Sequence, residues 1–288
     1  MDWTPRRERF RAMLEGAACV HPASVFDPMS VRIAEELGFE IGMLSGSVAS
    51  LAVLGAPDIV LLTLTEFASQ ALRINRAADL PLMTDADHGY GNALNVQRTV
   101  EELEIAGVCG LSIEDTLLPV PFGAPDKPQL LSIEEGVGKM RAALAGRQDK
   151  RLVIAGRTSA IGITGLADTI ARAKAYEAAG VDAFFVAGAK TRAEVEAVSA
   201  AIRIPLVLGT PAPALQDLAY LGAQRVRICI QGHLPIAAAM RAVYDTMKAL
   251  REGMRPKDVP GIASPELMKR VTRDAAYRRS IKDYLGGA

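Results

Sequence analysis

The chain has 288 residues, half of them hydrophobic, and its 33 basic residues balance its 33 acidic ones. This length is ample for a large core, in one α/β domain or two smaller ones, and the zero net charge gives no electrostatic reason to expect nucleic acid or an acidic membrane as a partner. No signal-peptide core follows the charged N-terminus, no apolar run is long enough to span a bilayer, and three scattered cysteines in apolar surroundings favour a reduced, cytoplasmic protein.

Strand-like and helix-like segments alternate along the chain. The strand-like segments are continuous apolar runs, which is typical of a parallel sheet covered by helices. They are predicted at residues 20–26, 41–44, 80–83, 110–113, 151–155, 182–187, 205–208 and 225–230. The matching helices are predicted at 30–37, 65–78, 95–106, 133–145, 166–179, 192–202, 214–221 and 234–251, with others at 6–15 and from about 264. Two loops stand out, a small-residue loop at 45–50 and a proline- and glycine-rich loop at 117–131 that has the length of a lid.

Eight βα repeats within about 230 residues match the repeat number and size of a (β/α)8 barrel, the TIM barrel. A doubly wound sheet is the alternative, but no GxGxxG opens the first βα unit. We therefore expect a single α/β domain over residues 1–288. Its barrel is predicted at about 18–251 and a C-terminal helical arm at about 252–288.

The segment at residues 85–92, DADHGYGN, follows the third predicted strand. Residues i and i+2 of a strand point to the same side, so Asp85 and Asp87 can converge. Two buried carboxylates repel each other, and a divalent cation removes that cost. Oxygen ligands alone suit Mg²⁺ or Mn²⁺. An ordinary acidic turn is the alternative for an isolated DxD.

In a barrel, polar residues at the carboxyl ends of the strands converge on one face. An arginine there can hold a carboxylate through two parallel hydrogen bonds, and the backbone N–H groups of a small-residue loop can bind an oxyanion. Asp115 suits an ion pair as well as a metal, and Arg157 can also pair with Glu114. The residues expected on this face are Ser45, Ser47, Asp58, Asp85, Asp87, Glu114, Asp115, Arg157, Thr158, Thr210 and His233.

Five motifs in this set occur in the order typical of one superfamily. They are SGS at 45–47, GAPD at 55–58, DADHGYGN at 85–92, IED at 113–115 and GRT at 156–158. Together they resemble the isocitrate lyase/phosphoenolpyruvate mutase superfamily. The resemblance implies a Mg²⁺-dependent enzyme acting on an α-keto or α-hydroxy acid. It also implies a barrel whose last helix is exchanged between subunits, with the segment after Arg251 as the exchanged arm of a homotetramer, a dimer of dimers.

The loop after the fourth strand separates the branches of that superfamily. Its lyases carry a catalytic cysteine in a KKCGH-like motif, and its phosphonate enzymes carry asparagine, lysine and threonine. This chain has LPVPFGA at 118–124 instead. SVFDPM at 24–29, EDTLLP at 114–119 and GH at 232–233 are similar to the oxaloacetate decarboxylase branch. Ser159 departs from the pattern, because many members carry aspartate or asparagine there.

This similarity implies a carboxy-lyase that converts oxaloacetate into pyruvate and CO₂ through a metal-stabilised enolate. Asp85 is the implied metal ligand, and the implied substrate contacts are Ser47, Arg157 and His233. We expect Asp87 and Glu114 to complete the metal site, with Mg²⁺ or Mn²⁺ bound directly or through water. Asp58 joins either this site or the catalytic set formed with Arg157 and His233.

Other functions remain open. The nearest are a 2-methylisocitrate-type C–C lyase and a phosphonopyruvate or phosphoenolpyruvate mutase-type enzyme acting on a related acid. A Schiff-base aldolase is a further alternative, because Lys190 lies just past the sixth predicted strand. A non-catalytic barrel that binds a metabolite is the last. The expected partner in each case is a small molecule such as a keto acid, with no nucleic acid and no membrane.

Overall fold

The fold was described from a computed structural model, which covers residues 1–124 and 127–286. Eight parallel strands form one sheet in sequence order. They are β1 (Ala23–Ser24), β2 (Gly42–Leu44), β3 (Leu82–Asp85), β4 (Gly110–Glu114), β5 (Val153–Thr158), β6 (Ala183–Val186), β7 (Leu206–Leu208) and β8 (Val226–Cys229). Val20, just before β1, forms a parallel bridge with Ile228 of β8. This bridge closes the sheet, and the predicted barrel is confirmed.

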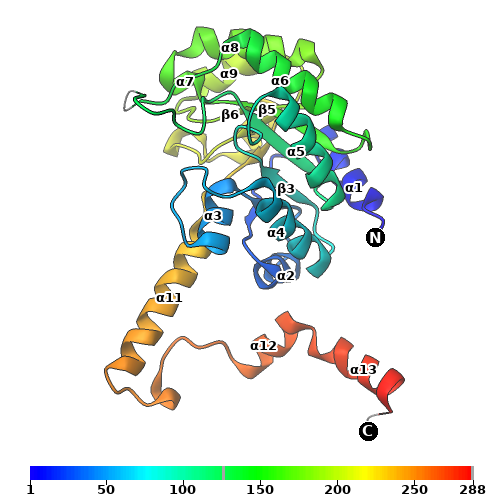
Figure 1. Cartoon of the computed structure of the whole chain (residues 1–288), viewed down its shortest axis with the longest axis vertical. Coiled ribbons are helices and arrows are strands. Elements are labelled where there is room, and N and C mark those ends of the chain that lie inside the picture. The colour runs from blue at the N-terminus through cyan, green and yellow to red at the C-terminus, as the bar shows by residue number, and fades with distance from the viewer. Residues whose placement is uncertain (125–126, 287–288) are drawn as a thin grey trace.

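Helices follow the strands as predicted, and all of them except the last, α11, lie around the sheet (Figure 1). After the successive strands come α2 (Pro28–Glu36), α4 (Leu64–Ala77), α5 (Ala93–Ile105), α6 (Ile133–Gly146), α8 (Leu166–Ala179), α9 (Arg192–Ala201), α10 (Leu218–Ala223) and α11 (Leu234–Arg251). Additional short helices in the loops are α3 (Gly46–Leu54), α7 (Ala160–Ile163) and the 3-10 turn η1 (Pro213–Leu215). No helix in the described ranges is both long and apolar enough to cross a membrane.

Helix α1 (Thr4–Glu15) closes the amino-terminal end of the barrel. Its Phe10 and Leu14 belong to the interior core together with Met43 of β2 and Phe185 of β6. The approach is so close that a Cβ at Gly110 would lie 2.6 Å from the Phe10 ring. Because the inward-facing side chains fill the barrel and α1 covers this end, the carboxyl ends of the strands remain for a ligand.

Several predicted boundaries differ from the observed ones, among them those of the first and third strands, and three of the differences have a clear local cause. Residues 45–50 are not a loop, because the Ser45 hydroxyl accepts a hydrogen bond from Val48 N at 3.2 Å and starts α3. The helix predicted at 214–221 divides into η1 and α10, and Asp217 caps the second piece. The fifth strand runs on to Thr158 rather than ending at 155, which places Arg157 within β5.

The loop at 117–131 is tied at its base. Leu117 N donates to Gln129 O and Leu131 N donates to Asp115 O, both at 2.8 Å. Residues 125–126 of this loop lie outside the described residues, and its role as a lid stays a prediction.

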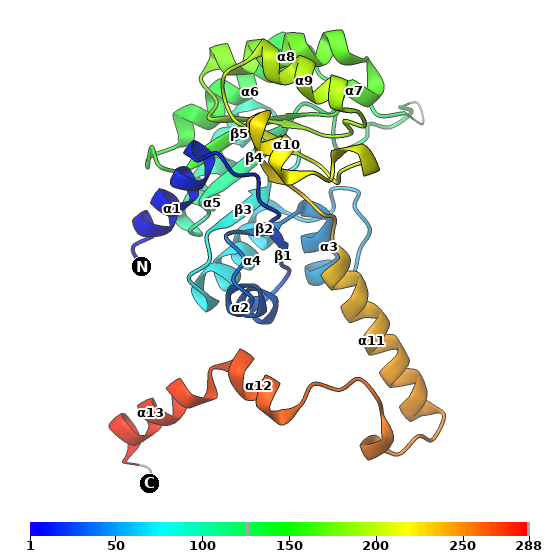
Figure 2. The same cartoon turned by 180° about the vertical axis from the view of Figure 1, so that it is seen from behind.

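The C-terminal segment extends away from the barrel. Figure 1 and Figure 2 show α11 projecting from the end of β8, followed by the turn η2 (Pro256–Asp258) and the helices α12 (Pro265–Thr272) and α13 (Asp274–Leu285). Ile236 is the one residue of α11 that is buried. Helix α12 contacts α2, where Arg270 pairs with Glu36 at 2.9 Å. Helices after Arg251 are present as expected, but the projecting segment begins with α11, at Leu234, and not at about 252 (Figure 1). The exchange of this arm between subunits stays a prediction, and residues 287–288 lie outside the described part of the chain.

Candidate active site

Three predicted residues meet through an arginine at the carboxyl ends of β3, β4 and β5. Asp85 ends β3, Glu114 ends β4, and Arg157 is the last residue but one of β5. Arg157 Nη1 pairs with Asp85 Oδ2, and its Nη2 lies 3.4 Å from Glu114 Oε2. Neighbouring parallel strands place these residues side by side, because Glu114 and Arg157 are register partners. The predicted pair of Arg157 with Glu114 is confirmed.

Two residues that the sequence analysis missed support this cluster. Ser112 Oγ donates to Asp85 Oδ1 at 3.0 Å. Ser112 precedes Glu114 by two positions on β4, so strand alternation could have identified it. The same alternation does not apply to Asp85 and Asp87, because β3 ends at Asp85 and Asp87 lies in the turn that follows. The Arg157 guanidinium carbon lies 5.1 Å from the centroid of the Phe185 ring, which forms a platform for the charge.

Arg157 stays charged within this cluster. Burial by itself lowers the pKa of Arg157, but the carboxylates of Asp85 and Glu114 outweigh burial and raise the pKa above its ordinary value. A guanidinium that cannot lose its proton is a donor and never a base. Its Nε is buried and has no hydrogen-bond partner in the described residues, so the group retains unused donor capacity.

Asp87 lies in a turn directly after β3, with a φ of 48°. Its carboxylate occupies the space beside Gly46, the first residue of α3, where a Cβ atom would overlap it. Burial raises the pKa of Asp87 well above its usual range, and repulsion from Asp85, Glu114 and Asp58 raises it further. The pKa of Glu114 is also raised, chiefly by burial and against the opposing charge of Arg157. The cluster therefore contains more negative charge than Arg157 neutralises.

Asp58 reaches the cluster from the loop after α3. The residue is exposed, yet desolvation and then repulsion from Asp85 raise the pKa of its carboxyl group, while Arg157 and His233 oppose the rise. Asp58 is therefore within electrostatic reach of the predicted set, and in the described part of the chain no hydrogen bond or ion pair joins its side chain to those residues.

His233 precedes α11 and is half-buried. Its Nδ1 lies 2.9 Å from the hydroxyl of Ser24 on β1. Burial lowers the pKa of His233, against the opposing effects of Asp85 and Asp58. Burial therefore favours the neutral form of the imidazole, and the charges of Asp85 and Asp58 act on it from nearby.

Ser47 belongs to the first turn of α3, and its hydroxyl lies 2.8 Å from that of Ser45. The first amides of a helix have no intrahelical acceptor, and the helix dipole makes this end positive. The N-terminus of α3, next to Asp87, therefore provides N–H groups for an anion such as a substrate carboxylate.

The donor set fits a hard divalent cation by its chemistry. As the side chains lie, no three or more His, Cys, Asp or Glu groups in the described ranges form a coordination cluster, and Arg157 already pairs with Asp85. The candidate ligands Asp85, Asp87 and Glu114 offer oxygen only. Burial, and after it the neighbouring acids, raise the pKa values of Asp87 and Glu114, and a bound cation would favour their ionised forms.

Other residues predicted near this face have different roles. Asp115 is fully buried away from the cluster, where its Oδ2 accepts from Arg172 Nη1 at 2.9 Å and from the Tyr176 hydroxyl at 2.6 Å. Thr158 Oγ1 accepts from Ala160 N at the start of α7. Thr210 lines a surface hollow together with His21, Pro211, Gln216 and Gln231.

Lys190 does not have the surroundings of a Schiff-base lysine. It is exposed at the start of α9, where its backbone N–H donates to Glu194. A catalytic lysine of that type needs a desolvated amine or a neighbouring cation to lower its pKa.

Comparison with known proteins agrees with this geometry. The family model described as phosphoenolpyruvate phosphomutase matches residues 10–251. A protein of Rhodopseudomonas palustris (strain BisB18) named oxaloacetate decarboxylase is 60% identical over 286 residues, which is 99% of each chain. Another of the same name from Bradyrhizobium diazoefficiens is 61% identical over the same length, again 99% of each chain.

Solved structures also match nearly the whole chain. Oxaloacetate acetylhydrolase in complex with the inhibitor 3,3-difluorooxalacetate has a TM-score of 0.85 at 27% identity and covers 98% of both chains. Phosphonopyruvate hydrolase in complex with oxalate and Mg²⁺ has a TM-score of 0.83 at 28% identity, covering 97% of this chain and 99% of that one. A third is 2,3-dimethylmalate lyase, a PEP mutase/isocitrate lyase superfamily member, with a TM-score of 0.85, 25% identity and coverage of 98% and 99%. The chain therefore belongs to the phosphoenolpyruvate phosphomutase family of enzymes, within the PEP mutase/isocitrate lyase superfamily.

Proposed function

We propose that this enzyme is a carboxy-lyase that decarboxylates oxaloacetate to pyruvate and CO₂ with the help of Mg²⁺. The observation that carries the substrate is the 60% identity, over 99% of both chains, to a relative named oxaloacetate decarboxylase. The site geometry is compatible with it, because Arg157 and the N-terminus of α3 offer separate places for the two carboxylates of such an acid. Mn²⁺ is a substitute for Mg²⁺ with the same preference for oxygen ligands.

Each contact has a role in binding. The N–H groups of the first turn of α3, with the Ser47 hydroxyl, bind the C1 carboxylate. Arg157 is a permanent cation held in place by Phe185, and it binds a carboxylate or keto oxygen of the substrate. His233, which follows the carboxyl end of β8, binds a keto or carboxylate oxygen, and Asp58 contributes a carboxylate from the loop after α3.

Asp85 would hold the cation, with Asp87 and Glu114 binding it directly or through water. A bound Mg²⁺ supplies Lewis-acid polarisation of the keto group. The acidic residues are otherwise short of countercharge, so cation binding and proton release accompany each other at this site.

The reaction then needs little from the side chains of the loop at 117–131. The bond between C3 and C4 of oxaloacetate breaks, C4 leaves as CO₂, and the electron pair forms the enolate of pyruvate, which takes a proton at C3. The protein stabilises the negative charge that develops on the keto oxygen with fixed hydrogen-bond donors. No nucleophile takes part, in agreement with the absence of cysteine, lysine and histidine from residues 118–124.

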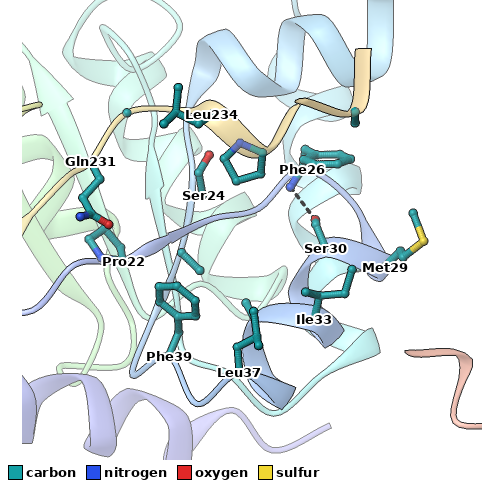
Figure 3. Close-up of a pocket in the computed structure, with 15 residues that line it drawn as sticks. Pro22, Ser24, Phe26, Met29, Ser30, Ile33, Leu37, Phe39, Gln231 and Leu234 are labelled. Atoms are coloured by element: carbon teal, nitrogen blue, oxygen red, sulfur yellow. Dashed lines mark hydrogen bonds between the residues drawn. The ribbon is translucent and has the colours of Figure 1, made fainter. Parts of the chain in front are cut away.

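For the whole molecule we propose a single domain and a homotetramer built as a dimer of dimers. Support comes from the unburied apolar side of α11 and from a 440 Å³ apolar groove between β1, α2 and the start of α11 (Figure 3). A second copy that placed its α11 in this groove would cover both surfaces.

The direct test measures pyruvate formation from oxaloacetate with millimolar Mg²⁺ and with excess EDTA, for the wild type and Asp85→Ala. We expect chelator-sensitive turnover that falls at least a hundredfold in the variant, because the proposed metal ligand is lost. Asp79→Ala is the matched control, since Asp79 is exposed and pairs with Arg6 and Arg9 instead.

A wild-type rate no higher than that of free Mg²⁺ would exclude this substrate. The same protein would then be assayed with 2-methylisocitrate and phosphonopyruvate. Turnover of either acid would identify the corresponding alternative within the superfamily, and the cation site would be tested with that acid.

A further inference from the structure

Ser24 connects β1 to the beginning of α11 through one side-chain hydrogen bond. The residue is 8% exposed, and its Oγ lies 2.9 Å from Nδ1 of His233. Figure 3 shows Ser24 beside Leu234, the first residue of α11, at the edge of the apolar groove. The imidazole proposed to bind the substrate is therefore held from behind by a strand that contributes no other residue to the site.

The direction of this hydrogen bond follows from the surroundings of Ser24. A buried hydroxyl proton needs an acceptor, and within the described residues His233 Nδ1 is the partner recorded for the Ser24 side chain. The neighbouring groove walls are mostly apolar, with Phe26, Ile33 and Phe39 among them. These surroundings favour Ser24 as the donor to Nδ1, and in a neutral imidazole the remaining proton is then on Nε2.

We propose that Ser24 is a positioning residue that fixes His233 as the Nε2–H tautomer, so that the ring offers a hydrogen-bond donor to the substrate oxygen. This inference rests on the proposed function, in which the oxygen belongs to a keto acid. Negative charge grows on the keto oxygen while CO₂ leaves, and an N–H donor stabilises that charge. The other tautomer would direct a lone pair at the same oxygen and repel it.

The tautomer can be measured without turnover. The chain has only three histidines, so ¹⁵N-histidine labelling gives a tractable NMR spectrum with two ring-nitrogen signals for each residue. The pair of signals that disappears in His233→Gln belongs to His233. At neutral pH we expect a protonated, pyrrole-type Nε2 and an unprotonated Nδ1 for His233. Ser24→Ala should give mixed tautomers, whereas Ser24→Thr, which keeps the hydroxyl, should preserve the wild-type pattern. A protonated Nδ1 in the wild type, or an unchanged pattern in Ser24→Ala, would overturn the proposal.

The kinetic readout separates positioning from general stability. Loss of one neutral hydrogen bond behind the ring should lower kcat for oxaloacetate by roughly two- to tenfold with a smaller change in KM, and Ser24→Thr should restore kcat. Ser30→Ala is the control, because Ser30 lines the same groove but its hydroxyl accepts from Phe26 N and caps α2 (Figure 3). It should lower Tm and leave kcat and the His233 signals unchanged.

The two proposals fail in distinguishable ways. An inactive wild type with the expected tautomer would contradict oxaloacetate as the substrate and leave the role of Ser24 supported by the NMR result. An active wild type whose kcat is the same in Ser24→Ala would overturn the positioning role.

Discussion

Asp87 shows how one glycine makes room for a charged side chain. Its carboxylate lies where a Cβ of Gly46 would be, so the first turn of α3 and the turn after β3 can approach only because residue 46 has no side chain. The approach brings a carboxylate next to helix amides, which stabilise negative charge, and next to other acids, which do not.

This packing gives a prediction with a matched control. Gly46→Ala should displace the Asp87 carboxylate and lower kcat/KM at least tenfold, a loss of about 1.4 kcal/mol in transition-state stabilisation. Gly138→Ala, within α6, has no atom within 4 Å of its new Cβ and should leave activity unchanged while stabilising the helix by up to about 1 kcal/mol. Equal activity in the two variants would show that the Asp87 position is not required.

The raised pKa values of Asp87 and Glu114 determine how stability depends on pH. When the pH is below the ordinary pKa values of aspartate and glutamate, 3.8 and 4.5, both carboxyl groups are protonated in the folded and in the unfolded chain. Above these values the two groups ionise more readily in the unfolded chain, so their own contribution to the stability of the metal-free protein falls as the pH rises, until their raised folded pKa values are passed. Carboxyl groups with lowered pKa values, such as Asp149 and Asp168, contribute with the opposite sign. A cation binds the ionised form. The increase in Tm produced by millimolar Mg²⁺ should therefore be small near pH 4 and grow as the pH rises.

Thermal unfolding from pH 4 to pH 8, with Mg²⁺ and with EDTA, measures this effect. Asp87→Asn should raise the Tm of the metal-free protein at pH 7 by about 2–4 °C, which corresponds to about 1 kcal/mol for a chain of this size. The same substitution should also reduce the increase in Tm that Mg²⁺ produces. A Tm increase that is the same at every pH would contradict a cation held by these carboxylates.

At the scale of elements, Asp115 fixes the loop at 117–131 to the barrel wall. Its Oδ2 accepts hydrogen bonds from Arg172 and Tyr176 of α8, and Arg172 Nη1 also donates to Leu131 O at the far end of the loop. The strand end that carries Glu114 and the base of the loop are therefore attached to one helix.

Removing this carboxylate charge should be costly. Asp115→Asn removes the buried partner of Arg172 and leaves the guanidinium only its pair with the partly exposed Asp168. The free energy of unfolding should fall by about 3 kcal/mol. Tyr176→Phe removes a single hydrogen bond and should cost about 1 kcal/mol. Asp245→Asn, at an exposed pair with Arg241, should change stability by less than about 0.5 kcal/mol. Urea denaturation of the three variants measures their free energies of unfolding. Equal losses of stability in all three would contradict the predicted order.

At the scale of the whole molecule, helix α11 carries an apolar surface that stays exposed in the single chain. Helix α11 leaves Met240, Val243, Tyr244, Met247 and Leu250 exposed. Side chains of this kind in a contiguous group mark a contact with another protein. The groove beside β1 has matching apolar walls and lies on the same molecule, as a closed symmetric assembly requires.

Light scattering after size-exclusion chromatography tests the assembly. We expect the wild type to have four times the mass of the 30.6 kDa chain. Met247→Asp should reduce that mass, because a charge in the apolar contact is unpaired. Lys248→Gln on the same helix should not change it. A wild type with the mass of one chain at all concentrations would contradict the tetramer.

The sequence by itself determined the order and type of nearly all elements, because buried parallel strands are apolar throughout and glycines end the preceding helices. It also determined the candidate site, since the carboxyl ends of barrel strands share one face wherever the strands are correctly placed. Asp85, Glu114 and Arg157 were selected in this way, and the pair between Arg157 and Glu114 was expected.

Tertiary structure alone decided which neighbours each side chain has. Ser24 and His233 are 209 positions apart and meet because the sheet closes on itself. Asp115 could equally have joined the acidic cluster, and only the arrival of Arg172 and Tyr176 from α8 assigned it to the barrel wall. The position of α11 relative to the barrel is likewise decided by tertiary contacts. Periodicity predicts that α11 has an apolar side, but the surface that covers that side is set by contacts between distant segments, which local pattern does not encode.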